Sequence, residues 1–329
     1  MRRLFFLLSI ALLSPCWAQS EGAPPAGSAL LNRMVSALRI HNYSGDFSFE
    51  YDGRLESFSI EHFADDSREF ERLFRLTGNR QEFVRQGSAP RCGTIGGHLL
   101  AGSHLNLGSG DNLGLDQQYD ITLVGQDRIA GKVVLVVNLV PKDSHRYGMS
   151  FFIDAENYLP LSYVVFDAQK KQAIERLQFV SIKTNLEKES FEPAQSGSAI
   201  ALDSQLCIGS VFSPNGHSPW KPAWLPPGFV LSHFAESKQD GYMETYTDGL
   251  FSFSIFVKET DVVVSDNGRI EQGATSRGAL LTLISQVPLQ KSTRVSEGVS
   301  VSVVGEIPFG TAQKLTRSIS RVPSPTISP

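Results

Sequence analysis

The sequence predicts an α+β protein with a long, curved antiparallel sheet followed by a smaller second unit. Aromatic and polar residues alternate with period two in segments such as 46–52 and 58–62, as in strands with one buried face. Helical spacing of apolar residues is confined to a few short segments. The length of 329 residues favours two domains at about 100–200 residues per domain.

The first 18 residues have the features of a secretory signal peptide. Two arginines precede an apolar run from Leu4 to Leu13, and small residues precede a cleavage site after Ala18. This run is shorter than the roughly 20 residues of a membrane-spanning helix. We therefore expect residues 1–18 to be removed on export. A lipoprotein site with acylation on Cys16 is the alternative.

Residues 28–196 are predicted to form the larger unit. A helix is expected over 29–41, because apolar residues fall on one side and Ser28 is a suitable N-cap. A Gly-, Ser- and Asn-rich segment over 93–114 predicts a long loop. We expect strands over 46–52, 58–62, 72–76, 81–86, 119–124, 132–140, 146–154, 161–167 and 174–184.

Residues 197–219 are expected to be a linker, and residues 220–321 a smaller α+β unit. Asp248-Gly249 between two strand-like runs is a strong hairpin signal. The tail over 322–329 contains three prolines and is predicted to be disordered. In this unit we expect strands over 229–236, 243–247, 250–258 and 300–305, a short helix over 279–285 and a closing helix over 310–320.

Composition and motifs argue against several functional classes. A net charge of -4 disfavours nucleic-acid binding, which needs a basic surface. The sequence has no HExxH, CxxC, Walker A or GxSxG motif. We therefore predict a protein that is not an enzyme, with no catalytic residue, metal or cofactor. Cys92 and Cys207 would remain after cleavage, and the sequence leaves open whether they pair.

The 21 phenylalanines include several on the alternating strands. Ordinary core packing is one explanation, because one face of any half-buried sheet has this pattern. A strongly curved sheet can also leave part of such a face open for acyl chains, whose burial yields about 0.8 kcal/mol per CH₂. The lack of a polar constellation does not argue against lipid binding of this kind.

Short sequence segments along most of the chain resemble those of the MucB/RseB family. The second half carries the more specific ones, at 222–229, 246–254 and 304–308. The segment 92–114 departs from the family because it is Gly-rich and lacks aromatic residues. The first half contributes the strings at 42–47, 71–73, 80–87, 119–121, 125–131, 146–147, 152–154 and 159–161.

This resemblance implies a LolA/LolB-like half-open antiparallel barrel, with helices, for the larger unit. It implies a periplasmic negative regulator that binds the periplasmic part of a membrane-bound anti-sigma factor. Such a regulator shields the anti-sigma factor from proteolysis and so represses the envelope-stress sigma factor. Lipid signals, such as lipopolysaccharide, would release it. A periplasmic lipid or lipoprotein carrier is the alternative, and the sequence leaves open a homo-oligomer.

Aromatic residues supply the candidate sites for both ligands. Interface hot spots are enriched in aromatic residues, which favours those of the smaller unit for the partner. In each case the alternative role is packing in the core. The lipid candidates are Phe47, Phe49, Tyr51, Phe58 and Ile60. The partner candidates are Trp224, Tyr246, Phe251 and Phe253.

Overall fold

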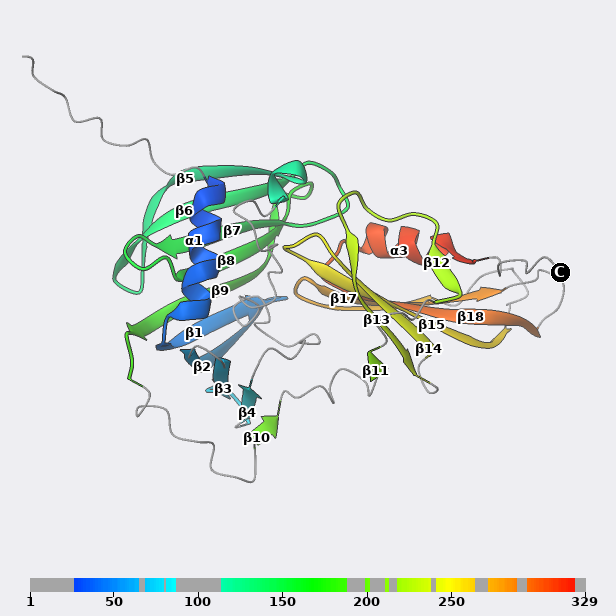
Figure 1. Ribbon diagram of the computed structural model, residues 1–329, viewed down its shortest axis with the longest axis horizontal. Helices are drawn as coiled ribbons and strands as arrows, with labels where there is room; N and C mark the ends of the chain where they lie inside the picture. Colours follow the sequence, from blue (N-terminus) through cyan, green and yellow to red (C-terminus); the bar gives the residue numbers. More distant parts are fainter. Residues whose placement is uncertain are drawn as a thin grey trace, which may run out of the picture.

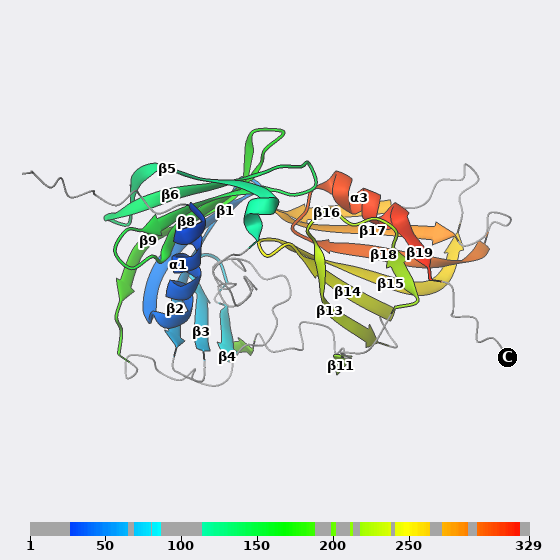
Figure 2. The same ribbon diagram turned by 45° about the horizontal axis from the view of Figure 1, so that its top comes forward.

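The computed structural model forms two antiparallel sheets that lie side by side (Figures 1 and 2). The predicted signal peptide, Cys92, Cys207, almost all of the 93–114 loop and most of the predicted tail lie outside the residues that the structure describes. The described residues are 27–64, 69–79, 81–86, 114–187, 199–201, 211–212, 218–237, 241–263, 272–288 and 295–322.

The larger sheet has ten strands. They are β1 (Tyr43–Tyr51), β2 (Arg54–Ala64), β3 (Glu69–Arg75), β4 (Glu82–Gln86), β5 (Tyr119–Ile129), β6 (Lys132–Pro141), β7 (Gly148–Asp154), β8 (Pro160–Asp167), β9 (Gln172–Thr184) and β10 (Ala199–Ala201). Their spatial order is β10-β4-β3-β2-β1-β9-β8-β7-β6-β5, antiparallel except for β10 beside β4. The outermost strands do not pair with each other, so the sheet curves without closing. This open sheet confirms the predicted half-open barrel.

Helix α1 (Gly27–Ile40) lies across one face of the larger sheet (Figure 1). Its boundaries agree with the predicted helix to within two residues. The buried apolar side of α1 belongs to the same core as the inward-facing residues of the strands. Among the described residues, no helix is both long and apolar enough to cross a bilayer.

The smaller sheet has seven strands in the order β11-β13-β14-β15-β18-β17-β16. They are β11 (Val211–Phe212), β13 (Val230–Ser237), β14 (Gly241–Thr247), β15 (Ser252–Val263), β16 (Gln272–Arg277), β17 (Leu280–Pro288) and β18 (Val295–Gly305). Helix α3 (Phe309–Ser318) packs on β17 and β18. The short strands β12 (Trp220–Pro222) and β19 (Ile319–Arg321) pair beside this helix.

The helix expected over 279–285 is wrong, because this segment is strand β17. Leu281, Leu283 and Ser285 are buried, whereas Ile284 is exposed, which is the period of a strand. A short apolar run is compatible with either structure, and here pairing with β16 on one side and β18 on the other decides it. Parts of the expected linker also form strands, namely β10 and β11.

The core beneath α1 gives a direct test of packing. Phe58 is fully buried and stacks on Phe47 with ring centroids 5.4 Å apart. We expect Phe58→Ala to lower the free energy of unfolding by about 3–5 kcal/mol, because it leaves a cavity. Leu55 lies on the same strand but is 67% exposed, so Leu55→Ala should change it by less than about 0.5 kcal/mol. Equal effects in urea unfolding followed by circular dichroism would contradict this packing.

Candidate functional site

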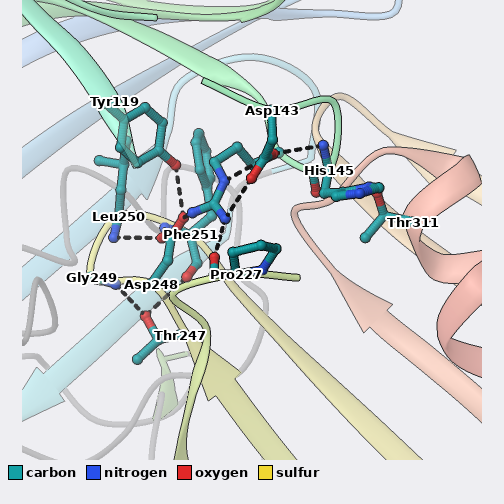
Figure 3. A network of polar contacts seen from close by, with 11 residues as sticks. Tyr119, Asp143, His145, Pro227, Thr247, Asp248, Gly249, Leu250, Phe251 and Thr311 are labelled. Carbon is teal, nitrogen blue, oxygen red and sulfur yellow. Dashed lines mark hydrogen bonds and ion pairs between the residues drawn. The ribbon is translucent and has the colours of Figure 1, made fainter. Parts of the chain in front are cut away.

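The two sheets are joined by polar contacts at two places, and a cavity lies between the sheets near the second. The first place is the β14–β15 turn against the loop between β6 and β7 (Figure 3). The second is the β16–β17 turn against β1, β2 and β9. These contacts connect residues more than 100 positions apart in the sequence.

A buried ion pair lies at the centre of the first contact. Arg146 Nη1 donates to Asp248 Oδ2 at 2.6 Å, and neither side chain is exposed. The same carboxylate oxygen accepts a hydrogen bond from the hydroxyl of Tyr119 at 2.8 Å. Arg146 also binds both carboxylate oxygens of Asp143 and the backbone carbonyl of Pro227. The guanidinium group therefore links three segments of chain (Figure 3).

The local sequence orients the carboxylate of Asp248. Its Oδ1 accepts the backbone N–H groups of Leu250 and Phe251 at 3.0 and 2.9 Å, as in an Asx turn. Gly249 has φ of +93°, which favours glycine at this position. Oδ1 of Asp248 therefore stabilises the hairpin turn, and Oδ2 is free to accept hydrogen bonds from Arg146 and Tyr119.

The electrostatics keep this cluster in one protonation state. Burial, followed by the negative charge of Asp248, raises the pKa of Tyr119 well above its usual value. Burial opposes the charge of Arg146, but the hydrogen bond to Asp143 and the charge of Asp248 outweigh it and raise its pKa. At neutral pH the tyrosine is a neutral donor and the guanidinium is charged.

The second contact is made by the tip of the β16–β17 hairpin. The N–H of Gly278 donates to Asp52, and that of Ala279 to Glu175, each at 3.0 Å. Arg277 Nη2 donates to the hydroxyl of Tyr51 at 2.8 Å and to Glu56 at 3.3 Å. Gly278 has φ of +58°, and a Cβ there would lie 2.5 Å from Glu175 Oε2, so this position favours glycine.

A cavity of about 610 Å³ lies beside this second contact, between the two sheets. Its walls are the β1–β2 turn, the β8–β9 turn, strand β16 and the start of α3. In the described ranges, no group of three or more His, Cys, Asp or Glu side chains is placed to hold a metal ion.

The structure places all five lipid candidates in the core of the larger sheet. Phe47, Phe49, Tyr51, Phe58 and Ile60 are each no more than 4% exposed. Tyr51 also lines the cavity between the sheets. Burial shows that these residues pack in the core of this structure, and it leaves their contact with lipid as a prediction.

The partner candidates divide into one accessible and three buried residues. Trp224 is partly buried. Its ring centroid lies 4.9 Å from the centroid of the His145 ring, and Lys314 Nζ lies 3.7 Å from the centroid of the Trp224 ring. Burial lowers the pKa of His145, which favours the neutral ring beside the tryptophan. The buried three are Tyr246, Phe251 and Phe253, so any effect of theirs on a partner would act through packing.

The sequence analysis missed the two residues at the centre of the junction. Arg146 was only the first residue of an expected strand and part of a family-like segment, and Asp248 was only part of a hairpin turn and of another such segment. Nothing local distinguishes a turn aspartate that also binds an arginine 102 residues away. The sequence offered one indication of this contact: Arg146 and Asp248 both lie within segments that resemble the family.

The buried pair predicts a large difference between two ion pairs of this chain. Asp248→Asn removes the buried counter-charge of Arg146 and leaves Asp143 as the other, so we expect a loss of up to about 3–5 kcal/mol in the free energy of unfolding. Asp120→Asn is the matched control, because its partner Lys142 is 3.6 Å away and both side chains are exposed. That change should cost about 0–1 kcal/mol. Similar losses in denaturant unfolding would show that the junction does not depend on the pair.

Comparisons with known proteins cover almost the whole chain. Sequence models of the MucB/RseB N-terminal and C-terminal domains match residues 26–196 and 214–320. The chain is 30% identical over 298 residues to the sigma factor AlgU regulatory protein MucB of Pseudomonas aeruginosa, covering 88% of this chain and 89% of that protein. It is 26% identical to the sigma-E factor regulatory protein RseB of Escherichia coli K12, covering 95% and 100%.

Solved structures show the same arrangement. A crystal structure of MucB in complex with MucA(peri) matches with a TM-score of 0.68 and 28% identity, over 91% of this chain and all of that chain. A crystal structure of MucB alone matches with a TM-score of 0.59 and 28% identity, over 90% and 98%. These similarities in sequence and structure confirm the resemblance seen in the sequence: the chain belongs to the MucB/RseB family.

Proposed function

We propose that this chain is a periplasmic regulator that binds the periplasmic segment of a membrane-bound anti-sigma factor. The observation that carries this proposal is the match, along nearly the full chain, to MucB bound to MucA(peri). The residues support binding rather than catalysis, because the junction offers a cavity and aromatic side chains. By covering the segment, the protein would shield it from proteolysis and so repress envelope-stress transcription.

Release by a lipid signal is the second part of the proposal. Phe47, Phe49, Phe58 and Ile60 share one core with helix α1, so an acyl chain reaches them only by replacing packing contacts of that core. A ligand shifts this equilibrium only through different affinities for the two states. A tenfold change in partner affinity corresponds to about 1.4 kcal/mol, a small fraction of what the aromatic core contributes.

Binding can be tested with the purified chain and the periplasmic segment of the anti-sigma factor from the same organism. We expect a complex that lipopolysaccharide weakens, because lipid and partner favour different states. Isothermal titration with and without lipid measures both affinities. If no complex forms in either condition while the protein retains lipid, the regulator proposal fails and the carrier alternative is favoured.

Trp224 is the partner candidate that a direct contact can reach. We expect Trp224→Ala to weaken partner binding at least tenfold, since tryptophan is enriched among interface hot spots. Val124→Ala is the control, because this residue is 60% exposed on β5, the outer edge of the larger sheet. If both variants bind the segment as the unchanged chain does, Trp224 is not a contact.

A further inference from the structure

Strand β16 is an outer edge of the smaller sheet. It pairs with β17, and no other described strand pairs with it. Residues Gly273 to Arg277 are all exposed. Before Arg277 their side chains are small and uncharged, so none of these side chains is bulky enough to block the backbone. Such an edge presents unpaired N–H and C=O groups to another strand.

The turn after β16 determines which backbone groups face outward. Gly278 has φ of +58° and Ala279 does not have a positive φ, as in a two-residue type II′ hairpin turn. Arg277 and Leu280 are then the closing hydrogen-bonded pair. Alternation along an antiparallel pair directs the N–H and C=O groups of Ser276 and Ala274 away from β17. Both residues line the cavity between the sheets.

We propose that the free edge of β16 binds an extended segment of the partner as an added strand. This inference rests on the proposed function, because it gives the anti-sigma segment a place on this chain. Strand addition obtains affinity from main-chain hydrogen bonds and specificity from pockets for alternate side chains. Here the edge of β16 would supply the main-chain hydrogen bonds, and the cavity would supply the side-chain pocket.

The cavity walls indicate the chemistry of the segment. Tyr147, Ile174 and the 46% exposed Phe309 provide apolar surface for one side chain. Carboxylates outnumber cations in the lining: Glu50, Asp52, Asp167 and Glu175 against Lys170 and Arg176. Charge complementarity therefore favours an extended segment that carries basic residues beside apolar ones.

The position of this edge also favours a peptide over a second copy of the chain. The hairpin tip is bonded to the larger sheet through Asp52 and Glu175, so an added strand would contact both sheets. A six-residue edge is only about 20 Å long. Pairing two such edges makes a contact far smaller than the ~1,200–2,000 Å² of a stable interface.

A proline pair tests the proposal on the full mature chain. Ser276→Pro removes one outward N–H without removing a hydrogen bond to β17, so we expect partner binding to weaken at least tenfold. Gln126→Pro is the matched control. Gln126 is exposed on β5, the outer edge of the larger sheet, and the turn after Ile129 likewise directs its N–H outward. The affinity of the Gln126→Pro variant for the anti-sigma segment should stay within twofold of that of the unchanged chain. Circular dichroism should show both variants folded.

Hydrogen–deuterium exchange of the unchanged chain gives a readout that needs no variant. The outward amides of Ala274 and Ser276, followed in peptides that cover 272–277, should exchange quickly in the free protein and slow at least tenfold with the anti-sigma segment bound. If the segment binds but neither exchange nor Ser276→Pro alters, strand addition is wrong while the proposed function stands. If the segment does not bind the unchanged chain, the proposed function itself fails. A dimer in light scattering that Ser276→Pro dissociates would assign the edge to a second copy and overturn the proposal.

Discussion

The relation between the two sheets depends on the buried ion pair of Arg146 and Asp248. Removing two charges from water is costly, and their attraction offsets this only when the geometry is good and the remaining hydrogen-bonding groups are satisfied. Here Asp143, Pro227 and Tyr119 supply those partners. Most displacements of one sheet against the other would leave a buried charge unpaired. The junction therefore favours one arrangement strongly, which a binding site that spans both sheets requires.

A second constraint is the competition between packing and ligand access in the larger sheet. The aromatic side chains predicted to hold an acyl chain belong to the same packed core as α1. A closed core of this kind is stable without a ligand, so lipid can act only by replacing contacts that the protein already makes. A lipid that enters this core would therefore need enough affinity to offset the packing contacts that it replaces.

The sequence predicted features that depend on local pattern. The helix over 29–41, the alternating strands and the hairpin at Asp248-Gly249 follow from spacing within a few residues, and the structure has them. The helix predicted over 279–285 is wrong, because the apolar run there is compatible with helix or strand and pairing with strands on both sides makes it a strand. The sequence analysis also missed the Arg146 contact, because no local signal reports which distant residue meets a turn aspartate. The aromatic residues are limited in the same way, because the alternating pattern is the same whether these side chains pack in a core or line a cavity.

The two outer edges of the sheets show why β16 differs from an ordinary strand edge. Proteins protect exposed edges with charged residues, bulges or covering segments. Strand β5 has such protection, with Asp120, Asp127 and Arg128 exposed along it and a register shift after Leu123. Gly273 to Ser276 carry no charge, and the register of β16 is regular. Its edge lies instead against a cavity whose other walls come from the larger sheet and the start of α3. Ala274 to Ser276 lie in the unprotected part of this edge and also line the cavity, so the unprotected backbone coincides with the proposed binding site.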